Sequence, residues 1–462
     1  MNAPLLIVIL GASLALAGFV LRSRLTAASS ITAVGALLMG AVALGVVLGE
    51  PFQILGIGVK LEAAWPVLGR SLVLGPANRS AIGFVFISGA LTLAGSWAAD
   101  APRRLGATGL MILVCLAAAM MVQPFVFSPP LIAAAAILGC LLVVRRDGSP
   151  GRAPALLMAA YTLAMMAILV AGWLIEVGGV TASALAPARA ATILLGLGLA
   201  IIVVAPPFHT WLTATASESH PLALVFLATA LQSSGLFLLL NSLASYPWMR
   251  SDPLVSSTLR GAGLFMIALG SLWCVAERRA PRIIAYALLV DFGVSLLALS
   301  TATAGGYGTA LGMAGARAAG AAVWAFGFSN LSDSTSPGVE RKPARKLAVM
   351  AALAGAFSLA GLPLTAGFAG RWLTLAALSA DTTATSAVIL GIVAVGISSM
   401  RWARLLDVRA SPVAAPLPRG RRTLLRIGAA SIVILGLLPG WLYAWALPAL
   451  SGLTGLLPPP AP

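Results

Sequence analysis

The sequence FSLAGLPLTAGFAGRW, residues 357–372, lies inside an apolar run that extends over residues 345–380. About 20 apolar residues are enough for a helix to cross the hydrocarbon core of a bilayer, so this run is too long for one straight span. Its centre, AGLPLTAG (360–367), contains glycine and proline, which interrupt helices. A broken helix is tolerated in a membrane only where protein or a watery cavity satisfies the freed backbone groups. Such breaks often mark ion or substrate paths.

Thirteen more apolar runs of about one span each are spread along the chain, with no interval long enough for a soluble domain. Hydrophobic residues make up 60% of the 462 residues and charged residues only 9%, and the mean hydropathy is +1.00. A soluble surface needs far more charge. We therefore predict an all-α polytopic membrane protein with about fourteen transmembrane helices, forming one domain over residues 1–462. The further runs cover about residues 3–21, 31–49, 81–98, 106–123, 126–144, 154–175, 190–207, 221–243, 261–276, 282–302, 306–329, 384–400 and 424–446.

The charged residues of the connecting loops alternate along the chain. No basic segment precedes the first run, which therefore indicates a span rather than a cleaved signal peptide. If the N-terminus is placed outside, the inner loops hold 21 Lys and Arg residues and the outer loops hold six. Because basic residues favour the cytoplasmic side, this bias predicts that both termini lie outside. The same bias accounts for the net charge of +16 without a nucleic-acid partner.

Motifs for cofactors, metals and covalent catalysis are missing from the sequence. The three cysteines form no CxxC pair, and the two histidines have no metal-ligand spacing. There is no GxxxxGK[ST], GxSxG or HExxH. We therefore expect no catalytic residues, no metal and no cofactor held by this chain alone.

Three ionisable residues fall within apolar runs, namely Asp291, Arg317 and Arg371. Charges at this depth are rare and costly, so they indicate either a structural ion pair or a role in ion conduction. Asp291 lies 13 residues before the short link centred near Ala304, and Arg317 lies 13 residues after it. If the two helices form an antiparallel hairpin, both side chains lie at the same depth and can pair. Glu176 and other charges near the ends of runs are more typical of the membrane interface.

Five segments resemble the antiporter-like membrane subunits of complex I (NADH-quinone oxidoreductase), Mrp-type antiporters and membrane-bound hydrogenases. FSLAGLPLTAGFAGRW is similar to the family's SLAGxPPxxGFxGKF and is the strongest match. The length of the chain, the number of runs and the GFAGRW sequence make the complex I N-type subunit the best fit. The other four segments are PPFHTWLTATASESHP (206–221), FLATALQSSGLFLLL (226–240), PRIIAYALLVDFG (281–293) and ARAAGAAVWAFG (316–327).

The resemblance implies two inverted-repeat halves with interrupted helices, which we place at residues 105–243 and 261–400. It also implies a row of titratable residues along the middle of the membrane. Arg317 matches the central lysine of the family, and Arg371 matches the lysine of GFxGKF. Arg282 and His209 match the arginine of KRLLAY and the histidine of PFH. With Asp291 and Gln232, these are the candidates for a proton path.

The chain departs from the family at the titratable positions. The family glutamate is expected within PLIAAAA (130–136), where no acid is present. One family lysine aligns with Gln232, or with Ser233 if the gap is placed differently, and another aligns near Ile202. The first half has therefore lost its titratable groups. The second half keeps cations as arginine, which holds its proton where a buried lysine can release it.

Three functions remain open from the sequence. The first is a non-redox, antiporter-like subunit of a complex-I-type NADH:quinone oxidoreductase that contributes to proton translocation, with a degenerate first half. The second is a structural subunit of such a complex that conducts nothing. The third is an Mrp-type Na+/H+ antiporter or a membrane-bound hydrogenase subunit. In each case the partners are other membrane subunits, the lipid bilayer and protons or Na+, and the location is the inner (plasma) membrane of the cell.

Overall fold

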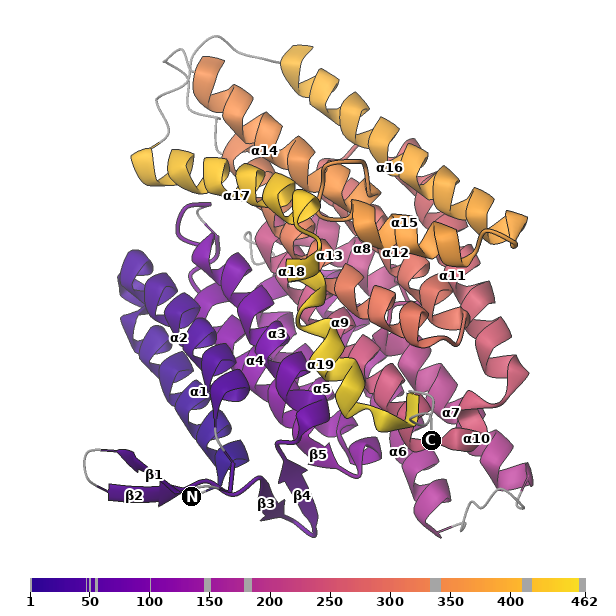
Figure 1. The fold of residues 1–462 in the computed structure, drawn as a ribbon. Coiled ribbons are helices and arrows are strands. Elements are labelled where there is room, and N and C mark those ends of the chain that lie inside the picture. The colour runs from indigo at the N-terminus through magenta and orange to yellow at the C-terminus, as the bar shows by residue number, and fades with distance from the viewer. Residues whose placement is uncertain are drawn as a thin grey trace.

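The computed structural model describes residues 2–46, 48–49, 51–54, 57–99, 101–144, 151–177, 185–332, 342–408 and 418–456. It is a bundle of long helices packed side by side (Figure 1). The long helices are α1 (Ala3–Val20), α2 (Leu25–Gly45), α3 (Pro76–Ala94), α4 (Leu105–Met121), α5 (Pro129–Val143), α6 (Arg152–Val177), α7 (Leu185–Ile202), α9 (Pro221–Ser245), α11 (Pro253–Ala276), α12 (Ala280–Ser300), α13 (Ala304–Ser332), α14 (Lys342–Ala360), α16 (Thr382–Val408) and α17 (Arg419–Leu437). The short ones are α8 (Thr210–Glu218), α10 (Pro247–Arg250), α15 (Phe368–Ala377), α18 (Gly440–Tyr443) and α19 (Ala446–Gly452).

The helices have the length and composition of membrane spans. Within the described ranges, nine helices are long and apolar enough to cross a membrane, or ten if α17 and the bent segment after it form one span. Three shorter apolar helices lie in α4, α7 and α14. Each of the fourteen predicted runs overlaps a helix. The protein is therefore a multi-pass, all-α membrane protein, and the number fourteen stays a prediction.

The outer surface of the bundle is apolar. Large side chains such as Leu16, Trp173 and Leu272 are between 58% and 67% exposed. In water that exposure would be unfavourable, whereas in a bilayer these side chains face lipid. By contrast, α9 lies wholly inside, with its most apolar window completely buried. The bundle therefore has an apolar exterior and an interior to which α9 belongs.

Two small sheets at one end of the bundle were not predicted. β1 (Pro51–Ile54) pairs with β2 (Ile57–Lys60), and β4 (Arg70–Val73) pairs with β3 (Ala64–Val67) and β5 (Val122–Gln123). Leu68 and Gly69, which join β3 to β4, both have positive φ, as a two-residue hairpin loop requires. From the sequence this segment was expected only as an outer loop, which contains Lys60, Arg70 and Arg79.

The order of helices repeats along the chain. Four long helices, a short one and another long one make up α4 to α9, and the same order recurs in α11 to α16. Ile202, where α7 ends, and Ala360, where α14 ends, are 158 residues apart. Thr210 and Phe368, which begin α8 and α15, are also 158 residues apart. Each of the two sets of helices thus contains one helix that ends and begins again after a gap of seven residues. The gap in the second set lies within the predicted AGLPLTAG segment.

A further bend occurs near the C-terminus. The predicted run at 424–446 does not form a straight helix, because α17 ends at Leu437 and the segment Gly440–Gly452 turns by 87°. Pro439 lies between the two helices, and a proline cannot continue a helix ladder. The last segment, α18 and α19, then runs along α13 and toward α3 (Figure 1).

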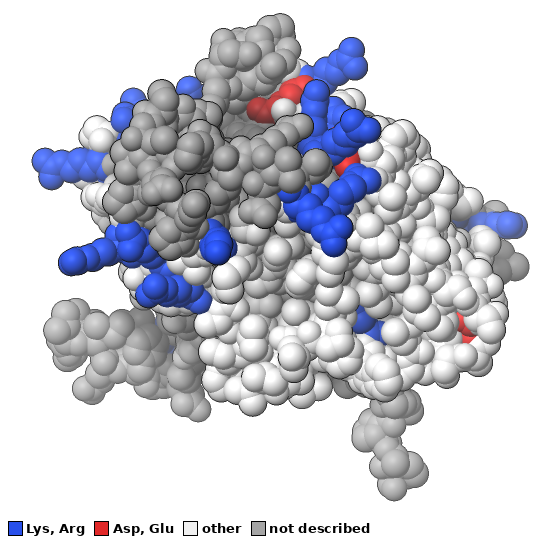
Figure 2. All heavy atoms as spheres, turned by 90° about the horizontal axis from the view of Figure 1, so that it is seen from above, with Lys and Arg blue, Asp and Glu red and all other residues white. Residues whose placement is uncertain are grey.

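Basic residues gather at one end of the bundle. Figure 2 shows Lys and Arg side chains concentrated on the upper face, with few acidic ones. Arg22, Arg103 and Arg104, from two different loops, line one common cleft. The N-terminus, the strands and α19 lie at the opposite end (Figure 1). This arrangement agrees with the prediction that the basic loops share one side of the membrane.

Candidate functional site

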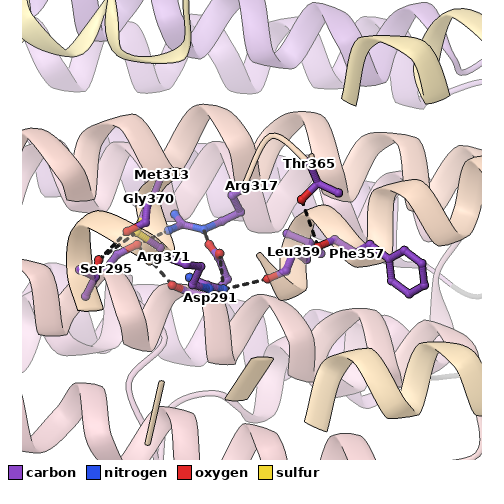
Figure 3. Close-up of polar contacts among 10 residues, drawn as sticks. Asp291, Ser295, Met313, Arg317, Phe357, Leu359, Thr365, Gly370 and Arg371 are labelled. Carbon is purple, nitrogen blue, oxygen red and sulfur yellow. Dashed lines mark hydrogen bonds and ion pairs between the residues drawn. The ribbon is translucent and has the colours of Figure 1, made fainter. Parts of the chain in front are cut away.

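Asp291 forms ion pairs with two arginines inside the bundle. It lies midway along α12 and is 4% exposed. One carboxylate oxygen, Oδ2, accepts a hydrogen bond from Nε of Arg317 on α13 at 2.5 Å, and the other, Oδ1, forms an ion pair with Nη2 of Arg371 on α15 at 2.7 Å (Figure 3). Arg317 and Arg371 are 1% and 2% exposed. The ion pair predicted from the α12–α13 hairpin is therefore present, and a third charge from α15 joins it.

Arg317 is fixed by further contacts on α12. Its Nη2 donates to Oγ of Ser295, which lies one turn beyond Asp291. The guanidinium carbon also lies 4.5 Å from the centre of the Phe292 ring, an arrangement that favours a cation. Because α12 supplies all three contacts, the cation is held in one position against that helix.

Arg371 also binds a backbone carbonyl that is left free at the break between α14 and α15. In an unbroken helix the carbonyl of Leu359 would accept from the N–H of residue 363, but that residue is Pro363 and has no N–H. Nη2 of Arg371 donates to this carbonyl at 2.8 Å. Gly361, at the break, has φ of +81°, and a Cβ there would lie 2.1 Å from Cγ of Arg371. The glycine therefore provides both the turn and the space for the arginine stem.

The close packing of α13 against α14 brings these parts together. A Cβ added to Gly355 on α14 would lie 2.4 Å from the carbonyl oxygen of Gly320 and 2.4 Å from the backbone nitrogen of Trp324, both on α13. Backbones approach this closely in membrane proteins only where small residues meet. Gly320 lies one turn after Arg317 on α13. The close contact between Gly320 and Gly355 therefore keeps Arg317 near the end of α14.

The cluster carries one positive charge in excess. Both guanidinium groups bind one carboxylate, so their bonded nitrogens lie within about 7 Å, where two cations repel by about 2 kcal/mol at an effective dielectric constant near 20. Nη1 of Arg317 and both Nε and Nη1 of Arg371 are buried without a hydrogen-bond partner among the described residues. The cluster therefore has more donors, as well as more positive charge, than the protein balances.

The equivalent part of the first half is neutral. The carbonyl of Ile202, freed because residue 206 is Pro206, is approached by the hydroxyl of Tyr161 on α6 at 3.4 Å. Gln232 on α9 is fully buried, and neither its amide nitrogen nor its amide oxygen has a partner in the protein. Residues 130–136 form the start of α5 with alanine where the family acid is expected. The carbonyl freed at this break is thus approached by a neutral hydroxyl, whereas the one freed in the second half accepts from Arg371.

The other two candidate residues lie away from Asp291. His209 precedes α8, half-buried, and its Nδ1 has no partner in the protein. Arg282 lies near the start of α12, about 13 Å along the helix from Asp291 at 1.5 Å per residue. It donates to Oγ of Ser217 at 2.7 Å and pairs with Glu277 at 3.3 Å. Of the six candidates, the structure brings together Asp291, Arg317 and Arg371.

Three participants were missed from the sequence. Ser295 and Tyr161 are ordinary residues of apolar helices, and the Leu359 carbonyl is part of the backbone. The spacing of four residues between Leu359 and Pro363, and between Ile202 and Pro206, was a usable signal, because each proline frees the carbonyl four residues before it.

With this geometry established, comparison with known proteins shows what the chain is similar to. A family model described as "NADH:quinone oxidoreductase/Mrp antiporter, TM" matches residues 181–398, slightly less than half of the chain. We refer to residues 181–398 as the antiporter module, after the description of the family model that they match. The module contains the α7–α8 break, the α14–α15 break and all three charges of the cluster. The resemblance predicted from the sequence is therefore confirmed.

Relatives of the module support the same family. NADH-quinone oxidoreductase subunit N of Geotalea uraniireducens is 26% identical over 257 residues, which cover 52% of this chain and 53% of the relative. The chain thus spans about half the length of the curated relatives it matches. Among solved structures, a chain of the archaeal membrane-bound sulfane sulfur reductase has a TM-score of 0.77 at 17% identity, covering 99% of this chain and 98% of that chain. A chain of the Mrp complex from Dietzia sp. has a TM-score of 0.76 at 16% identity, covering 99% and 100%. At these identities the structures show that the chain shares its overall fold with them over nearly its whole length.

Proposed function

We propose that this protein is a membrane-arm, antiporter-like subunit of a complex-I-type NADH:quinone oxidoreductase, most similar to its N-type subunit. The observation that carries the proposal is the placement of Asp291, Arg317 and Arg371 at the α14–α15 break of the antiporter module. Relatives named as NADH-quinone oxidoreductase subunit N support the choice of complex. The subunit itself has no redox role in this proposal, and its partners are other membrane subunits in the inner (plasma) membrane, with both termini outside.

Asp291 is the centre of any proton transfer in this proposal. Arginine keeps its proton at all relevant pH values, so Arg317 and Arg371 supply fixed charge. A carboxylate can accept and release a proton, and the break beside it provides the irregular backbone that lines ion paths. The two halves of the proposed repeat, 105–243 and 261–400, then differ in function, because a carboxylate lies beside the break of the second half, whereas Gln232 and Tyr161 in the first half are neutral.

A structural subunit that conducts nothing is the second candidate, and the neutral first half favours it. Gln232, Tyr161 and the alanines of residues 130–136 cannot exchange protons near neutral pH. An Mrp-type Na+/H+ antiporter or a membrane-bound hydrogenase subunit is the third candidate, and the similarity of fold to a chain of an Mrp complex supports the Mrp alternative.

Purification of the native complex tests the assignment. An affinity tag on the full chain, expressed from its own locus, is expected to co-purify NADH- and quinone-site subunits together with other antiporter-like subunits. Mass spectrometry of the purified complex identifies them. Recovery of a nickel hydrogenase, or of a set of small Mrp-type subunits instead, would refute the complex I assignment while leaving the fold unaffected.

Gln232 provides a test of the first half. We expect Gln232→Leu to leave proton translocation nearly unchanged, because the amide orients water but does not exchange protons near neutral pH. Leucine has nearly the same volume and removes the two unpartnered polar atoms from the core. The measurement is NADH-driven acidification of vesicles containing the assembled complex.

The matched control is Gln123→Leu, the same substitution at an exposed position of β5. A large loss of translocation in Gln232→Leu, with assembly and NADH oxidation intact and the control unaffected, would mean that protons do pass through the first half.

A further inference from the structure

Among the side chains that the structure describes, no counter-ion balances the excess charge of the cluster. Two guanidinium ions share one carboxylate, and all three groups are at least 96% buried. In a membrane interior, charges are normally paired with one another or with backbone carbonyls. Here the carbonyl of Leu359 binds Arg371, but a carbonyl carries no net charge. One positive charge therefore remains unbalanced.

Four other carboxylates of the described ranges, at the ends of helices, are bonded to partners outside the cluster. None of these four acids therefore supplies the missing negative charge. Glu176 binds Arg70, Asp381 binds Arg260, Glu277 binds Arg282, and Glu218 accepts from the backbone nitrogens of Arg152 and Ala153.

The free donors of the cluster have the character of an anion site. Three guanidinium nitrogens are buried with no partner in the protein, namely Nη1 of Arg317 and Nε and Nη1 of Arg371. Water molecules can satisfy hydrogen bonds, but they cannot balance a charge. Only an anion does both, because it accepts from N–H groups and carries the opposite charge.

The start of α15 adds to the positive potential. This ten-residue helix begins at Phe368 with no side-chain cap and no acidic residue in its first turn. The N-terminal end of a helix carries a partial positive charge and favours anions. Arg371 lies in the first turn, where a cation is unfavourable unless a negative group is near. Asp291 is already paired with both arginines, so a second negative group is favoured here.

We propose that the Arg317–Asp291–Arg371 cluster binds one small monovalent anion of the chloride class. The ligands are the guanidinium N–H groups that Asp291 and Leu359 do not use. A single negative charge makes the cluster neutral, whereas a divalent anion would reverse its sign. Tight packing beside the site, where a Cβ on Gly361 would overlap Arg371, favours a single atom over a larger oxyanion. The proposal does not depend on which complex contains the subunit or on whether it moves protons.

Thermal stability measured against chloride concentration tests the proposal. The full chain is purified in its native complex, and chloride is exchanged for gluconate at constant ionic strength. A ligand that binds only the folded state raises the melting temperature in a saturable way. We expect the melting temperature of this subunit to rise with chloride and bromide and then to level off. Arg371→Gln, which makes the remaining Asp291–Arg317 pair neutral, is expected to abolish the halide dependence.

The control variant is Arg419→Gln, which removes one positive charge from an exposed position of α17. It is expected to keep the full halide response. A wild-type protein with no response, or equal responses in wild type and Arg371→Gln, would overturn the proposal.

If Arg371→Gln fails to assemble, the wild-type protein alone decides. Crystals of the complex grown in bromide are expected to show an anomalous peak within hydrogen-bond distance of the Arg317 and Arg371 guanidinium groups. Bromide peaks confined to the protein surface, with none at the cluster, would refute the site.

Discussion

Replacing Asp291 by alanine is expected to destabilise the folded subunit by about 3–5 kcal/mol, the usual cost of removing one partner from a buried ion pair. The cost arises because Arg317 and Arg371 remain buried without their shared carboxylate. Since membrane subunits that do not fold are degraded, the amount of this chain in the assembled complex is expected to fall severely. The measurement is the quantity of subunit in the complex resolved by native gel electrophoresis.

The double variant Asp291→Ala with Arg317→Ala separates pairing from packing. Removing Arg317 as well takes away one of the two unpaired cations, so the double variant is expected to assemble better than Asp291→Ala alone. Recovery should be partial, because Arg371 still lies unpaired at the α14–α15 break. Equal losses in the single and double variants would contradict the view that the charges are coupled.

The second large effect is expected at Gly355. In Gly355→Ala the new methyl group would lie 2.4 Å from the carbonyl oxygen of Gly320 and from the nitrogen of Trp324. Both are backbone atoms, so neither can move without displacing α13. Overpacking of this kind costs about 1–3 kcal/mol or more. We expect α13 and α14 to separate, Arg317 to shift from Asp291, and the melting temperature of the complex to fall.

Gly396→Ala is the matched control for this variant. Gly396 lies in α16, and a Cβ there meets nothing within 4 Å. Because alanine favours helix over glycine by about 1 kcal/mol, the control is expected to be neutral or slightly stabilising. A Gly355→Ala protein as stable as Gly396→Ala would show that the two backbones are less tightly packed than the structure indicates.

Local sequence chemistry was sufficient to predict the break in the second half and the pairing of two charges. Glycine and proline at 360–367 interrupt a helix wherever it lies, so AGLPLTAG could be located without tertiary information. The Asp291–Arg317 pair followed from equal spacing about a short link, because a tight hairpin fixes relative depth. Both features depend on residues that are near in the sequence or joined by one turn.

The features that were missed depend on packing between distant segments. Arg371 reaches Asp291 only because α15 is turned back beside α12 and α13, and no spacing in the sequence gives that angle. Tyr161 approaches Ile202 across two helices that are both uniformly apolar. The hairpin β3–β4 depends on positive φ at Leu68 and Gly69, and leucine is an uncommon residue for that conformation. In each case the sequence pattern favoured a simpler structure.

The fixed charge of the cluster also couples this part of the protein to the voltage across the membrane. Moving one elementary charge through a potential of 100 mV changes its free energy by about 2.3 kcal/mol. Asp291 lies midway along α12, so a net charge held there lies within that electric field. An empty cluster therefore feels a force along the membrane normal, whereas a cluster neutralised by a bound anion feels none. Changes in the voltage applied to proteoliposomes are then expected to alter the packing of α15 against α12 only when halide is withheld.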